Sequence, residues 1–117
     1  MRRSAFSAFA LILAFAIPRL SLAQEAQKIA DGREIALKVC AICHVVTDDQ
    51  AVPPTMKPPA PRFADIAARP NVNEAFLRDF LLKPHGEARA MSAMPGFLMP
   101  SRQAEAVIAY LMSMKPR

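Results

Sequence analysis

The sequence is short of several residue types and patterns. It has no tryptophan, and 117 residues contain only two cysteines and two histidines, which leaves no two close ligand pairs for a structural zinc site. No segment alternates apolar and polar residues as a strand does, which argues against a βαβ frame. No dense stripe of lysine and arginine appears, so nucleic-acid binding is not indicated despite a formal net charge of +5.

The N-terminal segment has the organisation of a leader. A Met-Arg-Arg start precedes a largely apolar stretch, residues 5–17, which is too short to span a bilayer comfortably. The tripeptide Ser-Leu-Ala that ends at Ala23 resembles a signal-peptidase site. We therefore expect residues 1–23 to be a cleavable signal peptide and Gln24 to begin the mature chain, with an uncleaved anchor as the alternative.

Charge changes with this cleavage. Three of the 15 basic residues (Arg2, Arg3 and Arg19) lie in the leader and all 10 acidic residues follow it, so the formal charge falls from +5 to +2. Residues 24–117 then form one small domain outside the cytoplasm.

The remaining sequence predicts helices and loops. Small or apolar residues recur every three or four positions over 24–43, and a proline-rich loop follows over 45–61. A short helix is expected over 62–69. The face of a second helix, capped by Asn71 or Asn73, carries Phe76, Leu77, Phe80 and Leu81. A final helix, with Ser101 as its N-cap, buries Ala104, Val107, Ile108 and Leu111. The predicted class is all-α.

Such a chain offers little material for a core. Short helices, no tryptophan and a stiff proline-rich connector are a thin basis for a folded domain of this size. We infer that another component completes the core.

The sequence Cys40-Ala41-Ile42-Cys43-His44 predicts what that component is. At this spacing both sulfurs project from one side of a helical turn, where each can add across a vinyl group of one haem. His44 can then offer a ring nitrogen to the iron.

Three other readings of the cysteine pair remain open. A redox dithiol of the thioredoxin type expects a strand before it, a zinc site would have to recruit the distant His85, and a disulfide across one helical turn would be strained.

A sixth iron ligand can come from the segment AMSAMPGFLMP, which contains Met91, Met94 and Met99. Thioether sulfur is a soft ligand that raises the reduction potential relative to a second imidazole. Methionine is also an ordinary core residue, so its type alone does not decide.

Together these segments resemble the class I c-type cytochromes, small monohaem electron carriers. DGREIALKVCAICH is similar to the family's first helix, with Gly32 eight residues before Cys40. APRFADIA resembles the segment that carries a proline beside the histidine ligand, and MPGFLMPSRQAEAVIAYL the methionine loop and terminal helix. The resemblance covers almost all of residues 24–117.

The resemblance implies roles for individual residues. Cys40 and Cys43 attach one haem c covalently, and the carbonyl of Pro61 accepts a hydrogen bond from His44. Met94, which precedes a proline, is the sixth ligand. Tyr110 packs where the first and last helices cross at Gly32.

Rivals for the sixth position are Met91 and His85, while Met99 is expected to anchor hydrophobically. The chain departs from the family pattern at Ala60, where glycine is more usual, and in its proline-rich connector.

The implied fold is the cytochrome c fold, with three to five helices around one covalently bound haem. The side chains of Phe63, Phe76 and Phe80 are expected to line the haem. The implied function is periplasmic electron transfer with redox partner proteins, by a monomeric protein that is not an enzyme. Nucleic acid is not expected as a partner, and membranes are contacted only transiently, through partners.

The alternative functions are a subunit of a larger periplasmic dehydrogenase or oxidase, a peroxidase-like haem enzyme, and a thiol-disulfide oxidoreductase.

Overall fold

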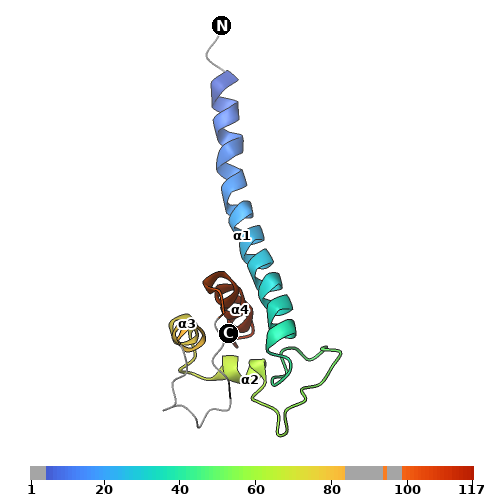
Figure 1. The fold of residues 1–117 in the computed structure, drawn as a ribbon. Coiled ribbons are helices and arrows are strands. Elements are labelled where there is room, and N and C mark those ends of the chain that lie inside the picture. The colour runs from blue at the N-terminus through green and yellow to red at the C-terminus, as the bar shows by residue number, and fades with distance from the viewer. Residues whose placement is uncertain (1–4, 84–93, 95–98) are drawn as a thin grey trace.

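The computed structural model describes residues 5–83, 94 and 99–117, with side chains described from residue 19 onward. Its helices are α1 (Ala5–Val39), α2 (Phe63–Ala68), α3 (Glu74–Leu82) and α4 (Ser101–Ser113). The described residues contain no strand, only an isolated parallel bridge between His44 and Ala60. The all-α class is therefore confirmed (Figure 1), and the four helices of the described residues lie within the expected range of three to five.

Helix α1 differs from the predicted helix over 24–43 at both ends. It runs without a break through the expected leader junction, and its first half extends away from the other helices (Figure 1). It ends at Val39, one residue before the first cysteine. Among the described residues, no helix combines the length and the apolar character needed to cross a membrane.

The first and last helices cross at Gly32. A Cβ atom at this position would lie 1.9 Å from the carbonyl oxygen of Ala106 and 2.9 Å from the Cβ of Tyr110. Only glycine therefore allows the two backbones to approach this closely. This crossing, which was expected from the resemblance, is the main packing contact of α4, which also contacts α3 and α2.

The helix caps resolve two predictions. Asn73, and not Asn71, caps α3, because its side-chain oxygen accepts a hydrogen bond from the backbone N–H of Phe76 at 2.9 Å. The expectation that Ser101 caps α4 is wrong. Pro100 is the N-cap, since its carbonyl already accepts the N–H groups of Gln103 and Ala104, and Ser101 is the first helical residue.

The core contains two buried aromatic side chains, Phe63 and Tyr110, but few large side chains are fully enclosed. The largest fully buried ones are the valines Val46, Val72 and Val107. In α3 Leu77 is buried and Leu81 packs against the core, whereas Phe76 is 43% exposed and stacks on Phe80 at the margin. The predicted four-residue face is therefore only partly buried.

Candidate functional site

The two cysteines lie in a turn that prolongs α1. The N–H of Cys40 bonds to Ala36 in the α-helical manner, and the N–H groups of Cys43 and His44 both bond to the carbonyl of Cys40, at 3.1 and 2.9 Å. This turn, residues 40–44, is called the CxxCH turn below. It holds the two thiols one helical turn apart, as the sequence predicted.

A second chain segment runs beside this turn. The N–H of Ala60 donates to the carbonyl of Cys43 and the N–H of Phe63 donates to the carbonyl of Val45, both at 2.9 Å. The two segments are parallel at the His44–Ala60 bridge. This pairing brings Pro61 against the histidine.

The His44 ring is held from one side by backbone. Its Nδ1 lies 2.6 Å from the carbonyl oxygen of Pro61, and the residue as a whole is buried. A carbonyl oxygen can only accept, so Nδ1 is the donor in this contact, and in the neutral ring Nε2 then has the free lone pair. The structure thus contains the contact that the resemblance implied.

Aromatic rings fix the orientation further. Phe63 meets His44 edge to face, with ring centroids 5.6 Å apart, and Tyr110 follows it at 6.4 Å. The Tyr110 hydroxyl donates to the carbonyl of Val46 at 3.2 Å, which connects α4 to the residues after the CxxCH turn. Tyr110 also packs at the Gly32 crossing, as expected.

Cys40 is poorly suited to act as the nucleophile of a redox dithiol. The two thiols form no disulfide, and burial, followed by repulsion from Cys43, raises the pKa of Cys40 to about 11. A redox dithiol needs a thiolate at neutral pH.

The zinc alternative has no support in the described part of the chain. No three His, Cys, Asp or Glu side chains gather there as metal ligands.

Ion pairs hold the start of the loop that follows the turn. Arg33 of α1 binds both carboxylate oxygens of Asp49, at 2.9 and 3.0 Å, and Arg62 pairs with Asp48. The hydrogen bond from Thr47, and then Arg33, hold the pKa of Asp49 below its ordinary value. No sequence pattern predicted these pairs, because their members are 14 and 16 residues apart.

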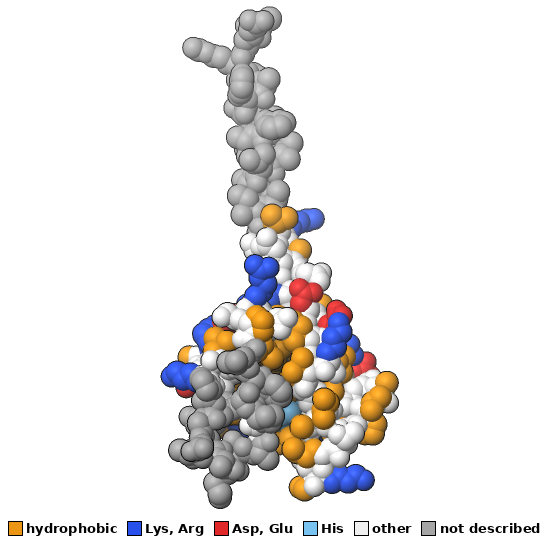
Figure 2. All heavy atoms as spheres, viewed as in Figure 1, with side chains coloured by type: hydrophobic (Ala, Val, Ile, Leu, Met, Phe, Trp, Pro, Cys, Tyr) orange, Lys and Arg blue, Asp and Glu red, His pale blue; other side chains and the backbone are white. Residues whose placement is uncertain are grey.

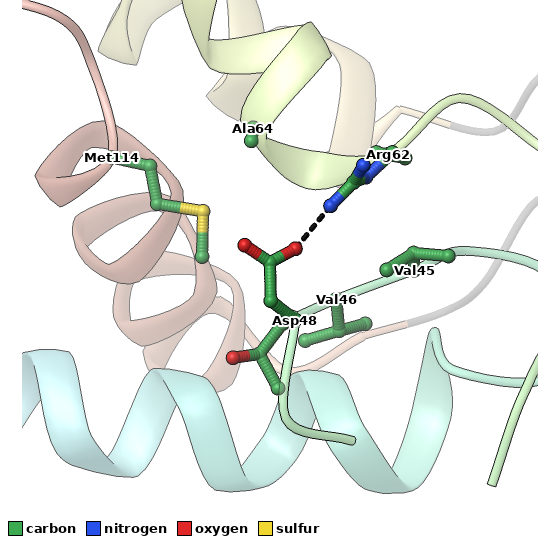
Figure 3. Close-up of a pocket in the computed structure, with 7 residues that line it drawn as sticks. Val45, Val46, Asp48, Arg62, Ala64 and Met114 are labelled. Atoms are coloured by element: carbon green, nitrogen blue, oxygen red, sulfur yellow. Dashed lines mark hydrogen bonds and ion pairs between the residues drawn. The ribbon is translucent and has the colours of Figure 1, made fainter.

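A small cavity lies beside the Asp48–Arg62 pair (Figure 3). Its volume is about 180 Å³, and it is lined by Val45, Val46, Thr47, Asp48, Arg62, Ala64 and Met114. It contains no residue of the CxxCH turn, and it is smaller than the pockets that usually hold cofactors. We therefore do not assign it to the haem.

Two of the four candidate sixth ligands, Met94 and Met99, lie among the described residues. Met94 is described, as a half-buried residue outside any helix, and Met99 packs against the core in the anchoring position expected of it. Met91 and His85 lie outside the described residues. Of the three phenylalanines expected around the haem, Phe63 contacts the His44 ring, and Phe76 and Phe80 stack on each other in α3.

The residues of the CxxCH turn fit a covalent haem. Two free thiols stand one helical turn apart, and the next residue presents an imidazole with one nitrogen occupied and the other available. An apolar cofactor attached here would add to the apolar area that the chain buries. Fold and site together define a helical protein of the haem-attaching, electron-carrying class.

Comparison with known proteins supports this class of protein. The sequence matches the Cytochrome c family over residues 29–115. It is 33% identical over 106 residues to a cytochrome c-552 of Bradyrhizobium diazoefficiens strain USDA 110, covering 91% of this chain and 93% of that protein. No solved structure shows a significant match. The chain belongs to the Cytochrome c family.

Membership of this family decides several of the predictions. The chain is a class I c-type cytochrome with covalently bound haem c, and it is an electron carrier that exchanges electrons with redox partner proteins, rather than an enzyme.

Proposed function

We propose that the chain is exported and works in the periplasm as a one-electron carrier, with His44 and Met94 as the axial ligands of the haem iron. The hydrogen bond between His44 Nδ1 and the Pro61 carbonyl carries the central part of this proposal, the role of His44 as an iron ligand. It selects the tautomer in which Nε2 can bind a metal, and it limits rotation of the ring. A histidine without such a partner would have to be oriented by the metal alone.

Other residues of the site have supporting roles. Cys40 and Cys43 hold haem c covalently, and this cofactor supplies a reversible one-electron couple. Phe63 covers the imidazole and keeps water from it, since the ring is 4% exposed and contacts His44 directly. With both axial positions filled by protein, small molecules have no open site, which suits electron transfer rather than catalysis.

Met94 is proposed as the sixth ligand on two grounds. It takes the ligand's place in the resemblance, directly before Pro95, and Met99 is engaged with the core instead. Its half-buried position is compatible with this role.

The leader proposal has support from packing. The side chains of residues 19–27 are exposed, and partial burial in α1 begins at Lys28. Of the residues that cleavage after Ala23 would remove, those whose side chains the structure describes, 19–23, are all exposed.

Haem attachment and export are tested together by fractionation. Periplasmic protein should give a haem-stained band after denaturing electrophoresis, and its intact mass should equal one haem plus a chain that begins at Gln24. A bare chain refutes haem attachment, and a mass that includes residues 1–23 refutes cleavage.

The sixth ligand is tested by substitution. Met94→Ala should abolish the weak long-wavelength sulfur-to-iron absorption band of the oxidised protein and lower its reduction potential, because a soft ligand to the reduced iron is lost. Met99→Ala is the matched control and should keep the band. Loss of the band in Met91→Ala, with retention in Met94→Ala, would transfer the assignment to Met91.

A further inference from the structure

The loop after the CxxCH turn exposes a group of apolar side chains. Ile42, between the two cysteines, is 61% exposed, and Val52 is 69% exposed. Pro53, Pro58 and Pro59 are exposed in the same loop, together with Lys57. These six residues are called the loop face. Figure 2 shows hydrophobic side chains gathered over the loop that Figure 1 draws in green.

The loop face is connected to the haem-binding turn. Both the backbone N–H and the hydroxyl of Thr55 donate to the carbonyl of Ile42, at 3.0 and 3.3 Å. Ile42 adjoins the haem-binding Cys43. A protein seated on the loop face therefore contacts a residue next to a haem attachment point.

The loop is also ordered by its own contacts. Gln50 accepts the N–H of Val46 and donates to the carbonyl of Val52, both at 2.7 Å. Five prolines over 53–61 fix five φ angles. A surface that is already ordered loses little conformational entropy on binding, which favours docking.

Charge on the loop identifies the kind of partner. Within residues 42–61 the charged side chains are Asp48, Asp49 and Lys57. Arg62 and Arg33 neutralise the two aspartates, whereas Lys57 has no acidic partner among the described residues. The loop thus presents apolar area together with one positive charge that no described carboxylate pairs.

We propose that the loop face is a docking surface for a redox partner protein whose own surface is apolar and carries a carboxylate placed to meet Lys57. This inference rests on the proposed electron-carrier function and adds to it the location and the chemistry of one contact. Apolar area supplies the affinity in such a contact, and the single charge pair supplies orientation.

A surface of defined chemistry can replace the unidentified partner in a test. The probe is a gold electrode coated with a mixed monolayer of methyl-terminated and carboxylate-terminated alkanethiols. The measurement is the coverage of electroactive, haem-loaded protein against its concentration. Half-saturation should rise about fivefold in Lys57→Glu, from loss of an exposed charge pair. In Val52→Asp it should rise about tenfold, from loss of buried apolar area.

Matched controls carry the same charge changes elsewhere. Arg69→Glu, at the other end of α2, matches Lys57→Glu, and Ala75→Asp, in the first turn of α3, matches Val52→Asp. Both should stay within about twofold of the parent protein, because exposed charges outside the contact are largely screened at moderate salt. Equal losses in controls and loop variants would mean that only net charge matters, and this would overturn the proposal.

Two further outcomes would also overturn it. One is unchanged half-saturation in both loop variants. The other is a concentration-dependent dimer in sedimentation that Val52→Asp abolishes, since the loop face would then contact a second copy of the chain. A failure of the electron-carrier function itself is separate. It would appear as the absence of a reversible one-electron couple with dissolved mediators in the parent protein.

Discussion

At the scale of single residues, one hydroxyl group joins the last helix to the haem-binding region. The Tyr110 O–H donates to the Val46 carbonyl at 3.2 Å in a buried setting, and Val46 is itself 1% exposed. The ring of Tyr110 contacts Phe63, and Phe63 in turn contacts His44. The hydroxyl and the ring can be separated by substitution.

Tyr110→Phe should keep the ring packing and lose only the hydrogen bond. The Val46 carbonyl would then be left without this donor, which costs about 1 kcal/mol of the free energy of unfolding. Urea unfolding of the haem-loaded protein measures this loss, and the absorption spectrum should not change. Tyr110→Leu, which removes the ring as well, should be clearly less stable than Tyr110→Phe. Equal stability of the two variants would contradict the separate role of the ring.

Single residues also show which parts of the site and of the helix caps could be predicted from the sequence. Cys40, Cys43 and His44 were predicted from their spacing alone, because neighbours in sequence on one turn are neighbours in space. The contact of Pro61 with His44 came only from the resemblance to a family. The pairing of Arg33 with Asp49 came from neither, since it depends on the path of an irregular loop. Ser101 failed as a cap because a carbonyl, not a side chain, begins the helix.

At the scale of helices, the crossing of α1 and α4 depends on Gly32. The space for a Cβ atom is already filled by backbone of α4, which cannot move aside as a flexible side chain can. The periodicity of α1 predicted its buried side, but only the resemblance indicated that another helix would cross at this glycine.

Gly32→Ala should separate the two helices and destabilise the protein by about 3 kcal/mol, the upper end of the usual cost of overpacking. For a domain of this size that corresponds to a fall in Tm of at least about 10 °C. Thermal unfolding followed by circular dichroism measures it. Ala30→Leu, an enlargement on the exposed side of the same helix, is the control and should change Tm by less than about 3 °C. A stable Gly32→Ala protein would mean that the crossing tolerates a wider separation.

Helices α3 and α4 are also joined by charge. Arg78 binds both carboxylate oxygens of Glu105, at 2.5 and 2.9 Å. The hydrogen bond from Arg78, and its positive charge, hold the pKa of Glu105 below the ordinary value of 4.5. A carboxyl with a lowered folded-state pKa stabilises the fold above its unfolded pKa, and this contribution is lost as pH falls through the folded value.

Glu105→Gln should therefore make the protein less dependent on acid pH. Between pH 7 and pH 3 the urea midpoint should fall less in Glu105→Gln than in the parent, and the two curves should approach each other at the acid end. Because the pair is partly exposed, the difference at pH 7 should be small and should shrink at high salt. A parallel pair of curves at all pH values would rule out this linkage. Asp65→Asn, on α2, serves as the control substitution, because Asp65 forms no ion pair with another described residue.

At the scale of the whole molecule, the described part of the chain fully encloses few large side chains. Its largest fully buried side chains are valines, and the helices after α1 are 6, 9 and 13 residues long. The sequence already indicated this shortage through its lack of tryptophan and its many prolines. Which side chains would be buried could not be predicted in detail, because Phe76 stays exposed although its spacing matches the buried face.

Haem should therefore contribute much of the burial that stabilises the fold. In Cys40→Ser/Cys43→Ser, which cannot attach haem covalently, the helix content should fall and the urea midpoint should drop or the cooperative transition should disappear, because isolated helices of this length are marginal in water. Met94→Ala is the matched control, since it keeps both thioether bonds while it removes the proposed sixth ligand, and it should retain most of its helix content. Circular dichroism of the purified proteins measures the difference. A double variant with full helicity and an unchanged urea midpoint would show that these helices fold without the attached cofactor.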